Sequence, residues 1–278
     1  MSEYLVEISG EHDYTVFTLD DAGELVLVED PSMVSVTTYI ERELFEEFDI
    51  EATLVRMRTR KNPDPRYAGL SEDEIRTWWE LNKKHAARMG TMMHACIESY
   101  LKSVIERGSY DDARFPELPP EEPLETPWKT VKCGIAIDVA QFHKFVESIC
   151  DALFPKLVER RMYDPRLHLC GTLDALFENT STGELSLYDW KRYDDFTRSD
   201  PFGKFGKRGR PAERMSDCKL SRVTVQLNAY RTMADRFVGR RISEQRVVVF
   251  HPEAPSYLQE TIAIDDGLVD RMIFDRNS

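Results

Sequence analysis

Two charged residues at the end of an apolar segment are the first candidates for chemistry in this sequence. Asp189 and Lys191 follow Leu185-Ser186-Leu187-Tyr188, and the preceding apolar segment contains Gly171-Thr172-Leu173-Asp174. Apolar and β-branched residues flank a polar Thr-Ser-Thr-Gly turn, which predicts two strands. Because residues two apart share a face of a strand, Asp189 and Lys191 should project together. Such a pair either forms a structural ion bridge or takes part in a reaction.

A third carboxylate comes from the segment before these two strands. Glu159 lies in a further predicted strand, residues 156–163, so Glu159, Asp174 and Asp189 fall on or beside three consecutive strands. If the strands are neighbours, the carboxylates can converge, and they repel one another unless cations neutralise them. Such oxygen ligands select Mg²⁺ or Mn²⁺, one or two ions of which can activate water for attack on a phosphodiester. Lys191 would then lie beside the attacking water or the phosphate.

A histidine and a glutamate lie one helical turn apart in residues 71–107. A capping-box pattern, Ser71-Glu72-Asp73-Glu74, opens this predicted helix, and Gly90-Thr91 is expected to interrupt it. After the break, His94 and Glu98 share one face. By spacing alone, such a pair is more often a surface pair than a ligand pair.

Composition restricts the setting in which the chain works. The 278 residues can form one elaborated domain or two small ones. We find no apolar run long enough for a membrane span and no signal or transit peptide, so we expect an intracellular protein, cytoplasmic or nuclear, without membrane association. Five widely spaced cysteines without a C-x-x-C pair argue against zinc knuckles and iron–sulfur clusters.

Positive charge is concentrated in one segment of an acidic chain. The net charge is −13, which excludes non-specific adhesion to DNA by the whole surface. Residues 191–222, however, carry ten basic and five acidic side chains. A positive band beside a carboxylate-bearing strand suits a polyanionic substrate, and the simpler interpretation is a solvated loop.

The predicted elements follow an order without internal repeats. A β-hairpin within residues 1–30, expected to extend or cap a sheet, is followed by helices, three strands, a helix, two strands and a helix. The Pro-rich segment 107–128 is predicted to be an extended connection.

Five short motifs follow one another in a fixed order along the chain. They are Gly90-Thr91-Met92-Met93-His94 with Ile97-Glu98, then Glu159, Gly171-Thr172-Leu173-Asp174, Asp189-Trp190-Lys191, and Gln226-Leu227 with Tyr230. Each motif alone is weak, but the ordered set, which covers about residues 90–230, is specific. It resembles the PD-(D/E)XK nucleases of the RecB type, a group that includes exonuclease domains of bacterial recombination enzymes, CRISPR adaptation nucleases, the mitochondrial genome-maintenance exonuclease and stand-alone members of viruses and phages.

The resemblance implies an α/β fold with a restriction-endonuclease-like core, in which helices flank a central mixed sheet. The chain would be a single nuclease domain, residues 1–278, with its core at 90–264. The N-terminal hairpin at 1–30, the helical insertions and the basic loop at 192–222 would be elaborations of that core.

The resemblance also implies roles for individual residues. Asp174 and Asp189 would be the principal metal ligands, the backbone carbonyl of Trp190 a further ligand, and Lys191 the catalytic lysine. The supporting positions are the metal-binding His94, the acidic Glu98 and Glu159, and Gln226 and Tyr230, which contact the DNA backbone or brace the site.

Departures from the family pattern shape the expected activity. Many relatives have Thr after the catalytic lysine, where this chain has Arg192, and the Cys quartet of the iron–sulfur subgroup is missing, so no such cluster is expected. No Walker A motif occurs, so any translocation would come from a helicase or recombination partner. We therefore expect a Mg²⁺- or Mn²⁺-dependent DNA exonuclease in replication, repair or recombination. The alternatives are a nuclease-fold protein that binds nucleic acid without cutting it, and a structure-specific endonuclease.

The basic loop is expected to clamp single-stranded or frayed DNA near the metals. Phe202 and Phe205 are available for stacking on bases. The basic residues that we expect to contact DNA are Arg192, Lys204, Lys207, Arg208 and Arg210.

Overall fold

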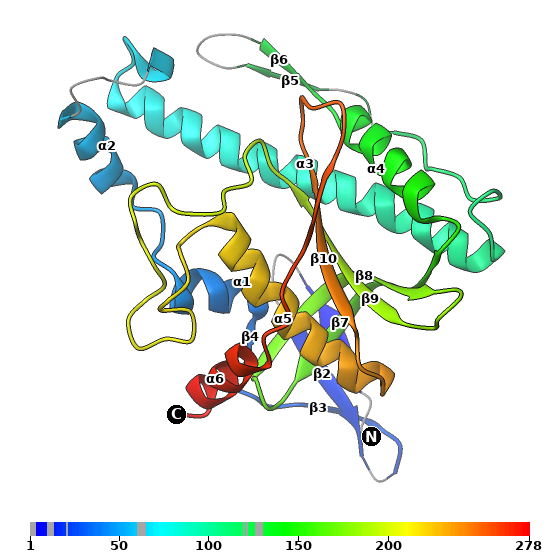
Figure 1. Ribbon diagram of the computed structural model, residues 1–278. Coiled ribbons are helices and arrows are strands. Elements are labelled where there is room, and N and C mark those ends of the chain that lie inside the picture. Colours follow the sequence, from blue (N-terminus) through cyan, green and yellow to red (C-terminus); the bar gives the residue numbers. More distant parts are fainter. Residues whose placement is uncertain are drawn as a thin grey trace.

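A six-stranded mixed sheet forms the centre of the molecule (Figure 1). The computed structural model describes residues 4–9, 14–20, 22–59, 65–118, 120, 122–125 and 130–278. The strand order is β11-β10-β9-β8-β4, with β7 paired to β8. This arrangement confirms the predicted α/β fold with a central mixed sheet. The strands are β4 (Val34–Ser35), β7 (Leu153–Asp164), β8 (Leu169–Asn179), β9 (Leu185–Arg192), β10 (Glu244–Phe250) and β11 (Leu258–Thr261).

Helices cover both faces of this sheet because its central strands are apolar on both sides. Leu185 and Leu187 of β9 pack into one core, whereas Tyr188 and Trp190 pack into the other. The first core contains residues of α1 (Val36–Tyr39), η1 (Ile40–Leu44), α5 (Lys219–Val238) and α6 (Asp266–Arg276). The second core contains residues of α3 (Glu72–Arg107) and α4 (Ala136–Ile149). Two further short helices are α2 (Ile50–Thr59) and η2 (Pro65–Tyr67).

The helix that carries His94 is continuous. The capping box is confirmed, because Glu74 N–H donates to Ser71 Oγ while the Glu74 carboxylate accepts from Ser71 N–H. The predicted interruption at Gly90-Thr91 is wrong, since α3 spans 36 residues. A glycine inside a helix costs only about 1 kcal/mol, which packing of the apolar face offsets.

The N-terminal strands form a sheet of their own. β2 (Tyr14–Leu19) and β3 (Leu25–Leu27) make the predicted hairpin, and β1 (Leu5–Ile8) adds a third antiparallel strand. Val6 and Val16 pack on Tyr163 and Cys170, so this sheet caps the ends of β7 and β8.

The two long connections differ from each other. β5 (Glu122–Glu125) and β6 (Thr130–Cys133) form a two-stranded sheet where part of an extended connection was expected. Residues 193–218, all of which are described, consist of turns and loops with one bridge between Phe205 and Ser216. Within the described parts of the chain, no helix has the length and apolar character needed to cross a bilayer.

Candidate metal centre

The candidate site lies where two strands of the central sheet part. β8 and β9 are paired from Glu178↔Leu185 to Ala175↔Tyr188, and Asp174 and Asp189 come next on the two strands. Beyond this point β9 stays with β10, whereas the same edge of β8 pairs with β4. The Trp190 N–H donates to Asp174 Oδ2 at 2.6 Å. A side-chain carboxylate therefore bridges the strands where backbone pairing has ended.

Glu159 reaches this fork from the other edge of β8. Its neighbours on β7 are in register with Ala175 and Leu173, which places Glu159 opposite Asp174. Glu159 has a φ of +48°, in the left-handed region that costs a non-glycine residue roughly 1–2 kcal/mol. Backbone strain of this kind occurs preferentially at functional sites.

His94 of α3 completes a compact group of ligand atoms. Its Nδ1 lies 3.4 Å from Glu159 Oε1 and 3.7 Å from Asp174 Oδ1, while its Nε2 lies 3.1 Å from the Trp190 carbonyl oxygen. One ligand atom each from His94, Glu159 and Asp174 falls within 4.8 Å of the others. We call these three side chains the fork cluster.

Asp189 and Lys191 form an ion pair beside this cluster. They project from one face of β9, as predicted, and Lys191 Nζ lies 3.0 and 2.9 Å from the two carboxylate oxygens of Asp189. The Asp189 side chain is 1% exposed. Asp189 therefore lies beside the fork cluster, where Lys191 balances the charge of its carboxylate.

The electrostatics of the fork reflect burial and mutual charge. Burial raises the pKa of Asp174, and it raises that of Asp189 to about 6 although Lys191 opposes the shift. Burial acts to lower the pKa of His94, but the carboxylates of Asp174 and Glu159 outweigh it and bring the value to about 9. The same balance raises the pKa of Lys191, mainly through Asp189. In the metal-free protein, His94 is thus an imidazolium at neutral pH.

The donor set of the fork fits a divalent cation. Two carboxylates, an imidazole and the Trp190 carbonyl face one another in a half-buried position, and such oxygen donors suit Mg²⁺ or Mn²⁺. An imidazole ligand favours Mn²⁺ over Mg²⁺. Because His94 must lose its proton to become a ligand, metal binding should release protons.

Glu98 is not brought into this group. Its carboxylate pairs with Lys102 Nζ at 2.5 Å, one turn further along α3. The side chain thus forms the surface pair that helical spacing alone would suggest.

Gln226 and Tyr230 lie on the α5 side of the fork. Gln226 Nε2 donates to the Tyr230 hydroxyl at 3.4 Å. The buried Tyr230 ring packs so closely on β8 that a Cβ at Gly171 would lie 2.5 Å from its Cε1 atom. Only glycine fits at position 171 without a shift of this ring.

Two residues near the site were missed by the sequence reasoning. The Tyr14 hydroxyl, from the N-terminal sheet, lies 3.5 Å from Thr172 Oγ1, two residues before Asp174. Asp138 of α4 is fully buried and accepts from Arg192 Nε at 3.0 Å. No sequence signal marks either one, because both contacts join distant parts of the chain.

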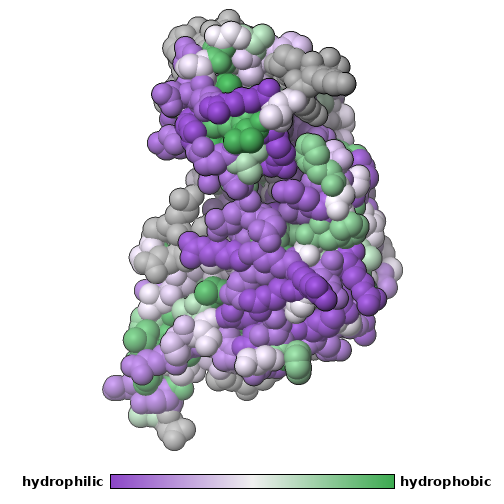
Figure 2. Space-filling view, turned by 90° about the vertical axis from the view of Figure 1, so that its left-hand side faces the viewer, coloured by the Kyte–Doolittle hydropathy of each residue, from purple (hydrophilic) through white to green (hydrophobic). Residues whose placement is uncertain are grey.

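Three of the five predicted DNA-contacting basic residues have partners within the protein. Besides Arg192, Lys207 Nζ donates to the Arg42 carbonyl at 2.6 Å, and Arg210 pairs with Asp275 at 2.7 Å. Lys204 and Arg208 are exposed, and no side-chain partner is found for them among the described residues. The face that carries this loop is mostly hydrophilic (Figure 2).

Comparisons with known proteins leave the function open. No family model matches the chain, and no curated protein matches it. A solved structure described as "Crystal structure of SSO0001" is similar over 90% of this chain and 77% of that one, with a TM-score of 0.35 and 15% identity. This degree of similarity supports no conclusion about function.

Proposed function

We propose that this chain is a divalent-metal-dependent deoxyribonuclease of the PD-(D/E)XK, RecB type, and more specifically an exonuclease. The observation that carries the proposal is the convergence of His94, Glu159 and Asp174 at the fork, with Lys191 on the adjoining strand. These residues come from four of the five motifs that resemble the family. A purely structural ion bridge between Asp189 and Lys191 would not require His94 or a strained Glu159.

The roles of the residues follow from their positions. His94, Glu159 and Asp174 would hold the metal, with Asp189 and the Trp190 carbonyl as further ligands. The bound metal would supply a Lewis acid and an acidic water. The Trp190 N–H fixes one carboxylate oxygen of Asp174. Lys191 stays protonated and is oriented by Asp189, so that its ammonium can offset negative charge on the phosphate in the transition state.

The basic loop supplies contacts to a single strand or a frayed end. Lys204 and Arg208 present exposed cations, and the rings of Phe202 and Phe205 are 67% and 54% exposed, so they are accessible to bases. The protein would work inside the cell, with any duplex opening provided by a helicase or recombination partner.

The decisive test is degradation of end-labelled single- and double-stranded DNA in Mg²⁺, Mn²⁺ or EDTA. We expect cutting only with metal, loss of cutting in Lys191→Ala, and wild-type rates in Lys102→Ala, which removes an exposed lysine of α3. Absence of metal-dependent cutting, or full activity of Lys191→Ala, would contradict the proposed nuclease activity.

The same assay separates the two alternatives. A protein that binds DNA without cutting it would retain labelled DNA in a binding assay and leave it intact. A structure-specific endonuclease would cut a covalently closed circle that contains a hairpin or an unpaired bubble, whereas an exonuclease spares every closed circle.

A further inference from the structure

An open surface cavity, lined mainly by charged residues, lies apart from the fork cluster. It has a volume of about 620 Å³ and is formed by the second half of α5, α6, and the turns that follow β7 and α5. None of its lining residues belongs to the fork cluster or to the basic loop. Its size is in the range that holds nucleotide-sized ligands. Its basic lining residues are Arg166, Arg231, Arg236, Arg240 and Arg241.

The lining of this cavity is rich in arginine although the chain has a net charge of −13. The lining also holds Asp235, Asp266 and Asp270, and two carboxylates outside it pair with arginines of the group: Asp164 with Arg166 and Arg236, and Glu178 with Arg240. Clustered guanidinium groups favour an anionic ligand through the donors that these pairs leave free.

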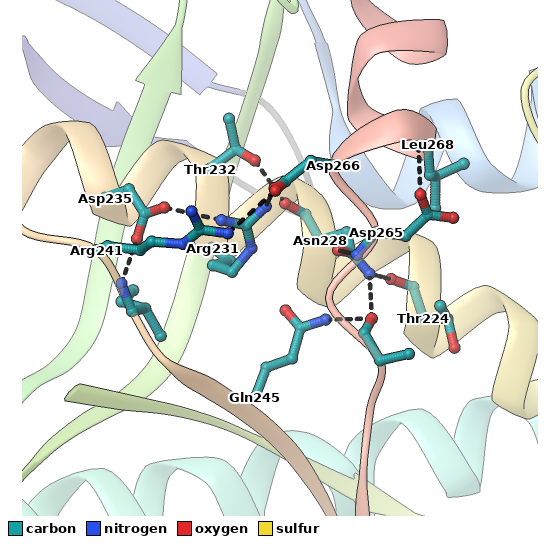
Figure 3. A network of polar contacts seen from close by, with 12 residues as sticks. Thr224, Asn228, Arg231, Thr232, Asp235, Arg241, Gln245, Asp265, Asp266 and Leu268 are labelled. Atoms are coloured by element: carbon teal, nitrogen blue, oxygen red, sulfur yellow. Dashed lines mark hydrogen bonds and ion pairs between the residues drawn. The ribbon is translucent and has the colours of Figure 1, made fainter. Parts of the chain in front are cut away.

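One wall of the cavity is rigidly built. Arg231 is 4% exposed, and its guanidinium pairs with Asp235 at 2.8 Å and Asp266 at 2.5 Å (Figure 3). Asp235 also accepts from the Ile242 N–H at 2.7 Å, which ties the turn after α5 to the helix. The position of Arg231 is therefore fixed before any ligand binds.

Arg166, Arg236 and Arg241 retain donors for a ligand, whereas Arg240 pairs with Glu178 at 2.9 Å. Arg166 and Arg236 share one buried carboxylate, Asp164, at 2.7 and 2.9 Å, so one positive charge of this pair is not balanced there. Arg241 contacts Asp266 through Nη2 at 3.1 Å, and its side chain is 70% exposed. Because a guanidinium has five N–H donors, each of these residues can still bind an oxyanion through a free edge.

We propose that this arginine-lined cavity binds a phosphate group of a nucleotide-sized anion. Guanidinium groups match the oxygens of a phosphate with two parallel hydrogen bonds, which distinguishes this site from a general positive surface. The phosphate can come from a free anion or from a nucleic-acid backbone. The inference does not depend on nuclease activity, because the two sites share no residue.

The test is calorimetric titration of the full chain with sodium pyrophosphate. EDTA keeps metal at the fork cluster from recruiting the anion. We expect saturable one-to-one binding by the wild type, and binding at least about tenfold weaker in the double variant Arg236→Ser/Arg241→Ser, since two charge-assisted contacts are lost. The control Arg58→Ser removes an exposed arginine that pairs with Glu72 elsewhere, and should bind as the wild type does.

A competition arm identifies the source of the phosphate. Displacement of pyrophosphate by a single-stranded oligonucleotide supports a backbone phosphate, and lack of displacement supports a free anion. No saturable binding by the wild type, or unchanged binding in the folded double variant, overturns the proposal. If the double variant does not fold, Arg241→Ser alone, at an exposed position, is titrated and must bind more weakly than Arg58→Ser.

Discussion

Two polar regions of this protein, the network between α5 and α6 and the fork, differ in how fully their polar and charged groups are paired. In the network between α5 and α6, Asn228 donates to the carbonyls of Thr224 and Ala263 and accepts from the Asp265 N–H (Figure 3). Gln245 donates to the same Ala263 carbonyl. These side chains mainly satisfy backbone groups, and the network anchors the segment that leads into α6.

At the fork, the negative charges are balanced less completely by positive ones. Among the described residues, Glu159, Asp174 and Asp189 pair with two cationic side chains there, His94 and Lys191, and Glu159 keeps a strained backbone. Charge repulsion and backbone strain of this kind lower the stability of the fold. Such features are found preferentially at functional sites. The two regions thus hold buried polar groups in different ways: the network mainly satisfies backbone groups, whereas the fork gathers three carboxylates.

The largest expected effect is on DNA cleavage, which a substitution at the fork should reduce and a substitution in the α5–α6 network should not. Asp174→Asn keeps an oxygen for the Trp190 N–H but loses a charged ligand, so DNA cleavage in Mn²⁺ should fall on the order of 10³-fold. Asn228→Ala should cleave at the wild-type rate per folded molecule. Initial rates on end-labelled DNA measure both, and a similar loss in the two variants would remove the distinction.

For the free energy of unfolding, we expect the substitution in the α5–α6 network to have the larger effect and the substitution at the fork the smaller one. Asn228→Ala leaves buried backbone groups unpaired and should lower the free energy of unfolding by about 2–4 kcal/mol. Asp174→Asn removes the burial cost of the carboxylate and its repulsion from Glu159, but also its attraction to His94. These effects offset one another, so the free energy of unfolding should change by less than about 1 kcal/mol. Urea unfolding in EDTA measures both values, and equal destabilisation would contradict this account.

The pH dependence of stability should originate at the fork. The pKa of His94 is about 9 in the folded protein, above its ordinary value of 6.5, so the imidazolium stabilises the fold. This contribution is complete below pH 6.5 and is lost as the pH rises through 9, amounting to at most about 3 kcal/mol. Urea unfolding in EDTA at pH 6.5 and 9 should show the loss in the wild type. If His94→Gln showed the same loss of stability, the pH dependence would originate from groups other than His94.

A smaller effect tests the strain at Glu159. Glycine adopts positive φ freely, so Glu159→Gly should raise the free energy of unfolding by roughly 0.5–1 kcal/mol while it impairs cleavage. Arg161→Gly, two positions along the same strand, should lower it by about 1 kcal/mol. Thermal unfolding measures the stability of both variants. Destabilisation of similar size in both would argue against backbone strain at Glu159.

The smallest effects concern the basic loop. Arg208→Glu should weaken binding of single-stranded DNA several-fold and reduce its salt slope by about 1. Lys207→Glu should have less effect, because this ammonium already bonds the Arg42 carbonyl. Affinities at several salt concentrations measure the difference, and unchanged binding in both variants would exclude a clamp.

Local pattern was enough to predict the strands that carry the site. The predicted strands around Glu159, Asp174 and Asp189 are confirmed as β7, β8 and β9, because alternation and turn residues specify them locally. The departure of β9 from β8 was not predictable, since it depends on β4, more than 130 residues earlier in the chain, which pairs with β8 in its place.

Long-range pairing explains what the sequence did not reveal. We expected Arg192 and Arg210 to contact DNA. Their ion-pair partners, Asp138 and Asp275, lie 54 and 65 residues away, so no local signal marks these pairs. The prediction of a break in α3 was wrong because a local signal at Gly90 was weighed without the core that supports the helix.

The most direct test of the central claim is a Mn²⁺ titration of the metal-free protein by calorimetry. We predict saturable binding with proton release by the wild type, loss of this binding in His94→Gln, and wild-type binding in His143→Gln, which changes a histidine of α4 outside the fork cluster. Equal Mn²⁺ binding by the wild type and His94→Gln would contradict a metal centre at the fork.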